Sequence, residues 1–173
     1  MRKFINIADI SKKDLRLIID SAKLRKEKRS GLNKNAIDTD APLDGKILIM
    51  LFEKPSTRTR ISFDLAVKQL GGKSLILNPD EIHYGTGDES LYDTAKVLSQ
   101  YADIVMLRTN AHKYAEQFSK YLDVPLINGL TDLSHPCQIM SDVMTFEELK
   151  GPIKNKKIAW LGDGNNIVYS LIE

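Results

Sequence analysis

The stretch EKPSTRTR, residues 53–60, places three hydroxyl side chains and two arginines directly after an unbroken apolar run. Ser56, Thr57 and Thr59 offer short hydroxyl donors. Arg58 adds a planar, permanently charged guanidinium that suits phosphate. A helix beginning here would also present free backbone amides and the positive end of its macrodipole. These groups together indicate an anion site, although a solvated helix start capped by serine and threonine explains the same spacing.

Further polar residues follow other apolar runs. Arg60 lies two residues from Arg58 and cannot share its helix face, so we expect Arg60 to serve the structure. Arg108 ends the run DIVMLR, where it is either a ligand contact or the first solvated residue. In SHPCQ, His135 can donate to a developing negative charge, and Gln138 can share its helix face. A capping serine followed by a histidine bound to backbone is the alternative.

Cys137 and the histidines raise two other kinds of chemistry. Cys137 lies beside His135 at a helix start, where it is either an activated thiolate or a small buried side chain. His83, His112 and His135 lack the spacing of metal ligands. We therefore expect no metal site and no cofactor.

Two stretches resemble nucleotide-binding motifs without matching them. GGKS, residues 71–74, follows Val67 where a P-loop needs glycine, and it precedes a strand rather than a helix. GDGNNI, residues 162–167, has isoleucine at the third glycine position of the dinucleotide fingerprint.

Hydrophobic periodicity positions these residues on alternating strands and helices. Strands are expected over 46–52, 74–78, 103–108, 124–128 and 156–162. Helices are expected from Ser11, over 56–70, 90–101, 112–121 and 135–149, and from Ile167. The alternation predicts an α/β fold, a doubly wound and mostly parallel sheet with helices on both faces. In such sheets ligands bind beyond the carboxyl ends of the strands, where the candidate residues lie.

Composition is ordinary for a globular protein. The 173 residues are 42% hydrophobic and 28% charged, with a net charge of +2 and one cysteine. These values give no reason to expect nucleic-acid or membrane binding, and they favour a reducing, cytoplasmic location. The break at Gly151-Pro152 predicts one domain over 1–150 and the start of a second α/β domain over 151–173.

Four stretches, taken in order, resemble the ornithine carbamoyltransferases: FEKPSTRTRISF, LRTNAH, INGLTDLSHPCQ and GDGNN. STRTR with HPxQ is typical of the carbamoyltransferase superfamily, whereas HPCQ and GDGNN resemble the ornithine branch more than the aspartate branch. The resemblance covers nearly all of the chain. It implies a carbamoyl-phosphate-binding domain followed by the beginning of a truncated ornithine-binding domain. The implied reaction transfers a carbamoyl group to the δ-amine of L-ornithine, giving L-citrulline and phosphate in arginine metabolism, in either the biosynthetic or the catabolic direction.

The resemblance also implies a role for each candidate residue. The implied phosphate contacts form one run: Ser56, Thr57, Arg58 and Thr59. Arg108 would reach both phosphate and carbonyl, His135 would polarise the carbonyl oxygen, and Gln138 would hold the carbamoyl amide. Asn166, the second asparagine of GDGNN, would contact ornithine. Arg58, Arg108 and His135 would then carry the catalysis.

The loop 79–89 departs from the family pattern. Members of the family are homotrimers with active sites between subunits, and a residue of this loop reaches the neighbouring site. His83 stands where the ornithine branch usually carries glutamine. Because a protonated imidazole donates more strongly to phosphate, His83 predicts a pH-dependent phosphate affinity.

Three alternatives remain open at this stage. A sister carbamoyltransferase could take another amine, such as acetylornithine or putrescine. A non-catalytic phosphate- or nucleotide-binding α/β module would need only the anion site, and a thiol hydrolase would use Cys137. Nothing in the sequence clearly removes the proton of an attacking amine, so we expect an incomplete, inactive fragment.

Overall fold

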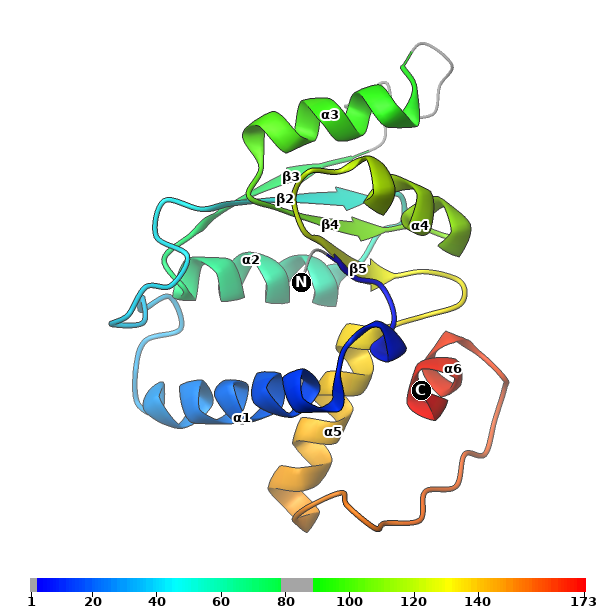
Figure 1. Cartoon of the computed structure of the whole chain (residues 1–173). Helices are drawn as coiled ribbons and strands as arrows, with labels where there is room; N and C mark the ends of the chain where they lie inside the picture. The colour runs from blue at the N-terminus through cyan, green and yellow to red at the C-terminus, as the bar shows by residue number, and fades with distance from the viewer. Residues whose placement is uncertain (1–2, 79–88) are drawn as a thin grey trace.

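The computed structural model describes residues 3–78 and 89–173, and the expected phosphate contact His83 lies outside these ranges. The strands are β1 (Lys3–Phe4), β2 (Ile47–Phe52), β3 (Lys73–Leu77), β4 (Ile104–Arg108) and β5 (Leu126–Leu130). The helices are the short 3₁₀ helix η1 (Ile7–Asp9), α1 (Lys12–Lys28), α2 (Thr57–Gln69), α3 (Leu91–Tyr101), α4 (His112–Tyr121), α5 (Pro136–Lys150) and α6 (Asn166–Ile172). Apart from β1 and η1, each begins within two residues of its expected start (Figure 1).

The described strands form one parallel sheet in the order β1-β5-β4-β2-β3. Strand β1, which the sequence pattern did not indicate, pairs with β5 at the sheet edge. Because all strands run in the same direction, β2, β4 and β5 end at one rim. Helices α2, α4 and α5 begin just beyond that rim. The expected doubly wound α/β fold is therefore confirmed.

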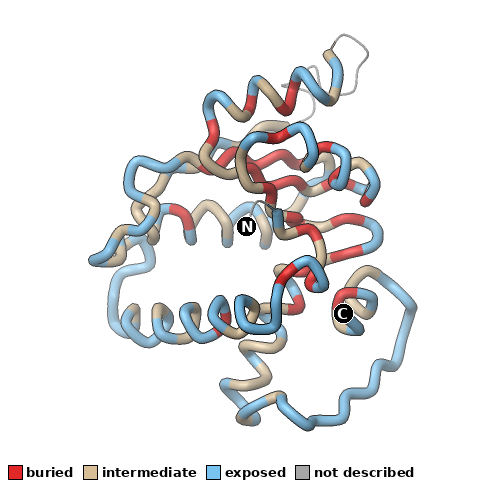
Figure 2. Tube along the Cα trace, in the orientation of Figure 1, coloured by how far each residue is buried: buried red, intermediate tan, exposed pale blue. Residues whose placement is uncertain are grey.

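The two faces of the sheet explain why β2 is apolar at every position. Ile49 and Leu51 pack with buried residues of α3 and α4 on one face. Leu48, Met50 and Phe52 pack with α2 on the other face. Figure 1 shows α3 and α4 on one side of the sheet and α2 on the other, and Figure 2 shows the strands as the most buried part of the chain. A strand covered on both faces buries the side chains of both, which favours apolar residues at successive positions.

Serine side chains cap three of the helices. Ser11 and Ser90 each accept the amide hydrogen of an aspartate three residues on, at 3.1 Å, and each donates its hydroxyl to that carboxylate. Ser56 accepts the Thr59 amide at 3.3 Å, but α2 has no acidic residue in its first turn. The positive end of the α2 dipole therefore has no negative charge from its own first turn.

The expectation of a strand over 156–162 is wrong. Ile158, Trp160 and Leu161 are 54%, 41% and 96% exposed. A strand needs the backbone groups of a neighbouring strand, and no described strand pairs with this segment. The chain runs from Gly151 to Asn165 without helix or strand and returns to the molecule at α6, which packs against α5 (Figures 1 and 2).

Candidate anion-binding site

A cavity of about 340 Å³ opens where α2 and α5 begin, at the rim formed by the ends of the strands. Its lining includes six residues selected from the sequence: Ser56, Arg58, Thr59, Arg108, His135 and Gln138. It also includes Ser62, Phe63, Leu130, Cys137, Ser141 and Ile167. Helical spacing could have indicated Ser62 and Ser141, three residues after Thr59 and Gln138. No local signal indicates Leu130 or Ile167 as part of the site.

Two arginines give this cavity its charge. Arg58 is exposed at the mouth, whereas Arg108 is half-buried at the end of β4. Burial, and then the nearby charge of Arg58, lower the pKa of the Arg108 guanidinium. Neither arginine has a carboxylate within 4.0 Å among residues 3–78 and 89–173. Two positive charges held together without a counter-charge favour a bound anion.

The contacts of Arg108 leave part of its guanidinium available. Its Nη1 donates to Thr59 Oγ1 at 3.4 Å and to the Gly129 carbonyl at 3.5 Å, both long for charged donors. Its Nε is buried and has no hydrogen-bond partner within the described structure. A ligand oxygen in the cavity would satisfy such a donor, which is otherwise costly to bury.

His135 is neutral at physiological pH. Burial, and then repulsion by Arg108, lower the pKa of the His135 imidazole to about 4, against a smaller opposing effect of Asp142. Its Nδ1 is buried and has no partner within the described structure. A neutral imidazole carries one N–H donor, so His135 can polarise a ligand oxygen without bringing a charge into the cavity.

The first turn of α2 supplies further donors. The amides of Thr57, Arg58 and Thr59 have no intrahelical acceptor by helix geometry, and Ser56 Oγ takes that of Thr59. The Thr57 side chain is exposed and does not line the cavity, so only its backbone amide is a candidate contact. The Arg60 guanidinium lies 6.0 Å from the centre of the Phe52 ring, which confirms its expected structural role.

A bulge in β5 shapes the end of the sheet beneath the cavity. Leu107 pairs with Asn128 but Arg108 pairs with Leu130, so Gly129 is the extra residue. Bulges bend a strand and redirect neighbouring side chains, and here both Arg108 and Leu130 line the cavity. A Cβ at Gly129 would overlap Met106 Sδ in the core. The glycine in INGL was the available sequence signal for this bulge.

A model of the family described as aspartate/ornithine carbamoyltransferase, carbamoyl-P binding domain, matches residues 2–148. The chain belongs to this family. A curated ornithine carbamoyltransferase of Rhizorhabdus wittichii is 51% identical over 172 residues, which are 99% of this chain and 55% of the relative. One from Paracoccus denitrificans is 49% identical, over 99% of this chain and 56% of its own length. The chain spans about half the length of the curated relatives it matches.

Solved structures give the same result. An ornithine carbamoyltransferase from Pyrococcus furiosus superposes with a TM-score of 0.90 at 43% identity, covering 99% of this chain and 53% of that one. The catalytic subunit of M. jannaschii aspartate transcarbamoylase superposes with a TM-score of 0.82 at 36% identity, covering 99% of this chain and 56% of that one. This portion of the fold is thus common to family members named for different amine substrates.

Two residues given ligand roles by the family resemblance have protein partners here. Gln138 Nε2 donates to Asp142 Oδ1 at 2.8 Å while the side chain lines the cavity. Asn166 Nδ2 donates to the Thr131 carbonyl at 2.7 Å, and Asn166 is not among the cavity residues, although Ile167 is. The structure therefore brings Gln138 to the site and leaves Asn166 just beside it.

Cys137 lines the cavity but is not an activated nucleophile. Burial raises the pKa of its thiol to about 12, and the Sγ contacts the Asn128 carbonyl at 3.5 Å. A thiolate nucleophile requires a lowered pKa and a positively charged surrounding. The thiol-hydrolase alternative is therefore not supported.

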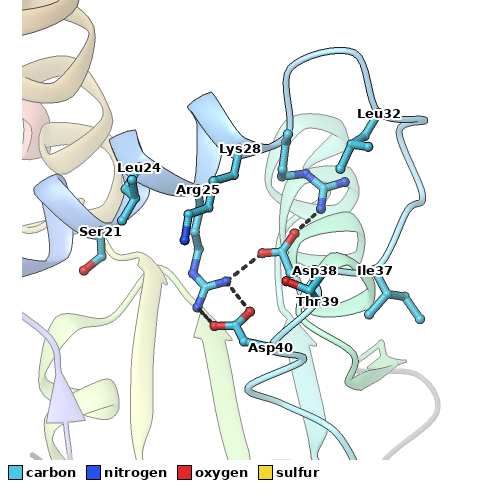
Figure 3. A pocket seen from close by; sticks show the side chains of 10 residues that line it. Ser21, Leu24, Arg25, Lys28, Leu32, Ile37, Asp38, Thr39 and Asp40 are labelled. Atoms are coloured by element: carbon cyan, nitrogen blue, oxygen red, sulfur yellow. Dashed lines mark hydrogen bonds and ion pairs between the residues drawn. The ribbon is translucent and has the colours of Figure 1, made fainter.

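A second cavity, of about 270 Å³, lies between α1 and the segment 37–40. Figure 3 shows Arg25 between Asp38 and Asp40, and Nη atoms of Arg25 donate to both carboxylates at 2.7 to 3.0 Å. The positive charge of Arg25 is balanced by the two carboxylates, whereas Arg58 and Arg108 have no such partner among the described residues.

Among residues 3–78 and 89–173, no group of three or more His, Cys, Asp or Glu side chains is arranged to hold a metal ion. None of the helices in that part of the chain combines the length and apolar character that crossing a bilayer requires.

Proposed function

We propose that residues 1–150 bind carbamoyl phosphate in the cavity at the start of α2. We further propose that a longer protein containing this chain transfers the carbamoyl group to the δ-amine of L-ornithine, giving L-citrulline and phosphate in arginine biosynthesis. The observation that carries the proposal is the pair Arg58 and Arg108, without carboxylate partners among the described residues, beside neutral His135 in one cavity. Family membership supplies the ligand that fits this arrangement.

In this proposal the phosphate lies at the amino end of α2, held by hydroxyl, amide and guanidinium donors. Its contacts are Ser56, Thr57, Arg58 and Thr59. Arg108 extends from the phosphate to the carbonyl oxygen, since its side chain lies between Thr59 and the end of β5. His135 donates to the carbonyl oxygen, and Gln138 holds the carbamoyl amide. Arg58, Arg108 and His135 are the proposed catalytic residues.

Catalysis would then consist of orientation and electrostatics. The amine attacks the carbonyl carbon, negative charge builds on the carbonyl oxygen, and phosphate leaves with the bonding electrons. Fixed donors from Arg108 and His135 face that charge without reorganising. Removing one such donor typically lowers the rate by about 10²–10³. No covalent enzyme intermediate is required, in agreement with the raised pKa of the Cys137 thiol.

The test is calorimetric titration of the 173-residue chain with carbamoyl phosphate, ATP and NAD. We expect weak binding of carbamoyl phosphate and weaker or no binding of the nucleotides. Arg58→Ala should weaken carbamoyl phosphate binding by about 10- to 100-fold, because one cation beside a dianion contributes about 1–3 kcal/mol even at this exposed position. Arg60→Ala is the matched control, since Arg60 packs over Phe52.

Two results would contradict the proposal. Equal affinity in Arg58→Ala and the unmodified chain would remove the arginine from the site. Tighter binding of ATP or NAD than of carbamoyl phosphate would favour a non-catalytic nucleotide-binding module.

The amine acceptor rests on the family branch. We assign ornithine because curated relatives near 50% identity carry that name, and we place Asn166 at the ornithine contact. Residues 3–78 and 89–173 offer no evident group to deprotonate the amine, so we expect the chain alone not to turn over. Citrulline production by a pure, mass-verified 173-residue sample would refute that expectation, and product analysis with acetylornithine and putrescine would test the acceptor.

The assembly and location follow the family resemblance. We propose a cytoplasmic homotrimer in which active sites are shared between subunits. His83 then serves as a phosphate contact from the loop 79–89, with affinity that rises as the imidazole is protonated. The test is the pH profile of carbamoyl phosphate affinity in the unmodified chain and in His83→Gln. Identical profiles would remove His83 from the site.

A further inference from the structure

The peptide unit joining Ser134 to His135 is held at both ends by buried polar groups. The Ser134 carbonyl accepts hydrogen bonds from the Thr131 amide at 2.9 Å, from Thr131 Oγ1 at 3.2 Å and from Asn128 Nδ2 at 3.3 Å. On the other side, the His135 amide donates to Ser170 Oγ at 2.9 Å. Thr131, Asn128 and Ser170 are each at most 1% exposed. The backbone that carries the imidazole is therefore fixed by groups 4, 7 and 35 residues away in the chain.

The direction of the hydrogen bonds around Ser170 follows from the available acceptors. Ser134 Oγ lies 3.2 Å from the Ile5 carbonyl, which can only accept, so the Ser134 hydroxyl donates there. Ser134 Oγ can then accept the hydroxyl hydrogen of Ser170, at 3.1 Å. The Ser170 oxygen keeps its lone pairs for the His135 amide. The chain of bonds thus runs from His135 through Ser170 and Ser134 to Ile5.

Helix α6 is anchored to this part of the molecule at three points. Besides Ser170, Asn166 donates to the Thr131 carbonyl at 2.7 Å. Glu173 Oε2 accepts the amides of Ile7 and Ala8 at 2.9 and 3.3 Å. Helix α6 is separated from α5 by the segment 151–165, which forms no helix or strand. Polar contacts therefore connect residues beyond that segment to the start of α5.

We propose that Ser170 is the positioning residue for His135, and that α6 completes the carbamoyl side of the site. This inference rests on the proposed function, because it concerns how His135 meets the carbonyl of the ligand. Without the Ser170 hydroxyl, the His135 amide is a buried donor with no acceptor, which favours a displaced backbone. The phosphate side of the site, formed by the first turn of α2 and by Arg58, does not depend on this bond.

The experiment compares two ligands that share a phosphonate. Phosphonoacetamide replaces the bridging oxygen of carbamoyl phosphate with a methylene group and keeps the carboxamide, whereas methylphosphonate lacks the carboxamide. Both are titrated into the 173-residue chain at alkaline pH, where both are dianions. The ratio of their affinities isolates recognition of the carbamoyl group from recognition of the phosphate.

We expect Ser170→Ala to reduce the preference for phosphonoacetamide about tenfold, toward the ratio measured in His135→Ala, with little change for methylphosphonate. Ser99→Ala is the matched control, since Ser99 is also a helical serine that accepts a backbone amide, that of Asp123, at 3.0 Å. A loss of folding alone would weaken both ligands together. An unchanged ratio in Ser170→Ala would overturn the inference.

Hydrogen exchange of the unmodified chain gives a second readout if Ser170→Ala does not fold. The His135 amide should exchange at least about 10²-fold more slowly than an unstructured amide, and rapid exchange would overturn the inference. Failure of the proposed function would give a different result from failure of this inference. In that case the unmodified chain itself shows no preference for phosphonoacetamide over methylphosphonate.

Discussion

Acidification is predicted to destabilise this protein through His135. In the folded state burial and Arg108 lower the pKa of this imidazole to about 4 from its usual 6.5. Because the folded-state pKa is the lower one, the stabilising contribution of the neutral imidazole is complete above pH 6.5 and is lost as the pH falls toward 4. The full difference corresponds to about 3 kcal/mol. We expect about 1–2 kcal/mol, because His135 is partly exposed and solvent screens the charge of Arg108.

Urea unfolding of the unmodified chain and of His135→Gln measures this effect. Glutamine keeps a polar side chain at the position but does not titrate, so carboxylates common to both proteins cancel in the difference. The unmodified chain should lose about 1–2 kcal/mol of unfolding free energy relative to His135→Gln between about pH 7 and about pH 4. A constant difference over that range would show that the imidazole is not desolvated in the folded state.

An anion bound in the cavity should raise the pKa of His135 part of the way back toward its usual value. Sulfate stays doubly charged throughout this pH range, and near His135 it would offset the repulsion from Arg108. The imidazole resonances followed by NMR should therefore titrate at a higher pH in sulfate than in chloride at equal ionic strength. If the His135 imidazole titrates near pH 6.5 and sulfate does not change that midpoint, His135 does not lie beside an anion site formed by the arginines.

Three further predictions concern other residues. Gly129→Ala should lower the free energy of unfolding by about 1–3 kcal/mol, because its Cβ would overlap Met106 Sδ; unchanged urea unfolding would contradict this. Glu147, whose pKa is lowered to about 2 chiefly by the hydrogen bond from Lys23, should stabilise the fold above pH 4.5 by about 1–2 kcal/mol relative to Glu147→Gln. This difference should vanish as the pH falls from 4.5 toward 2, and a difference independent of pH would rule the ion pair out as its cause. Cys137 should resist iodoacetamide near neutral pH until the chain unfolds, because burial raises the pKa of its thiol to about 12. The Cys137→Ser variant should bind carbamoyl phosphate as tightly as the unmodified chain. Rapid alkylation of the folded chain would contradict the raised pKa.

The elements of the fold were largely predictable because their signals are local. The uninterrupted apolar run ending at Phe52 predicts a strand buried on both faces, and β2 is such a strand. Ser56 predicts the start of α2, and its hydroxyl caps that helix. The strand expected over 156–162 is absent because its formation depends on residues far away in the chain. Its apolar pattern indicates a strand, but a strand exists only beside a partner, and none is present among the described strands.

The candidate site was predictable in its members but not in its electrostatics. Arg58, Arg108 and His135 could be selected because each lies at or beyond the end of a strand, and parallel strands end at one rim. Cys137 shows what spacing leaves open, since a thiol at a helix start can be either activated or buried. Its raised pKa is set by desolvation, which depends on every segment packed around it.

The sequence by itself determined the order of most strands and helices and the presence of hydroxyl and guanidinium groups at the sheet rim, because periodicity and helix starts involve residues close in the chain. Only the tertiary structure decided that β5 bulges at Gly129 beside Arg108 and the cavity, that the pKa of His135 is lowered, and that Ser170 accepts the hydrogen bond of the His135 amide. These properties depend on burial and on contacts between residues up to 35 positions apart. No local sequence pattern predicts contacts between residues so far apart in the chain.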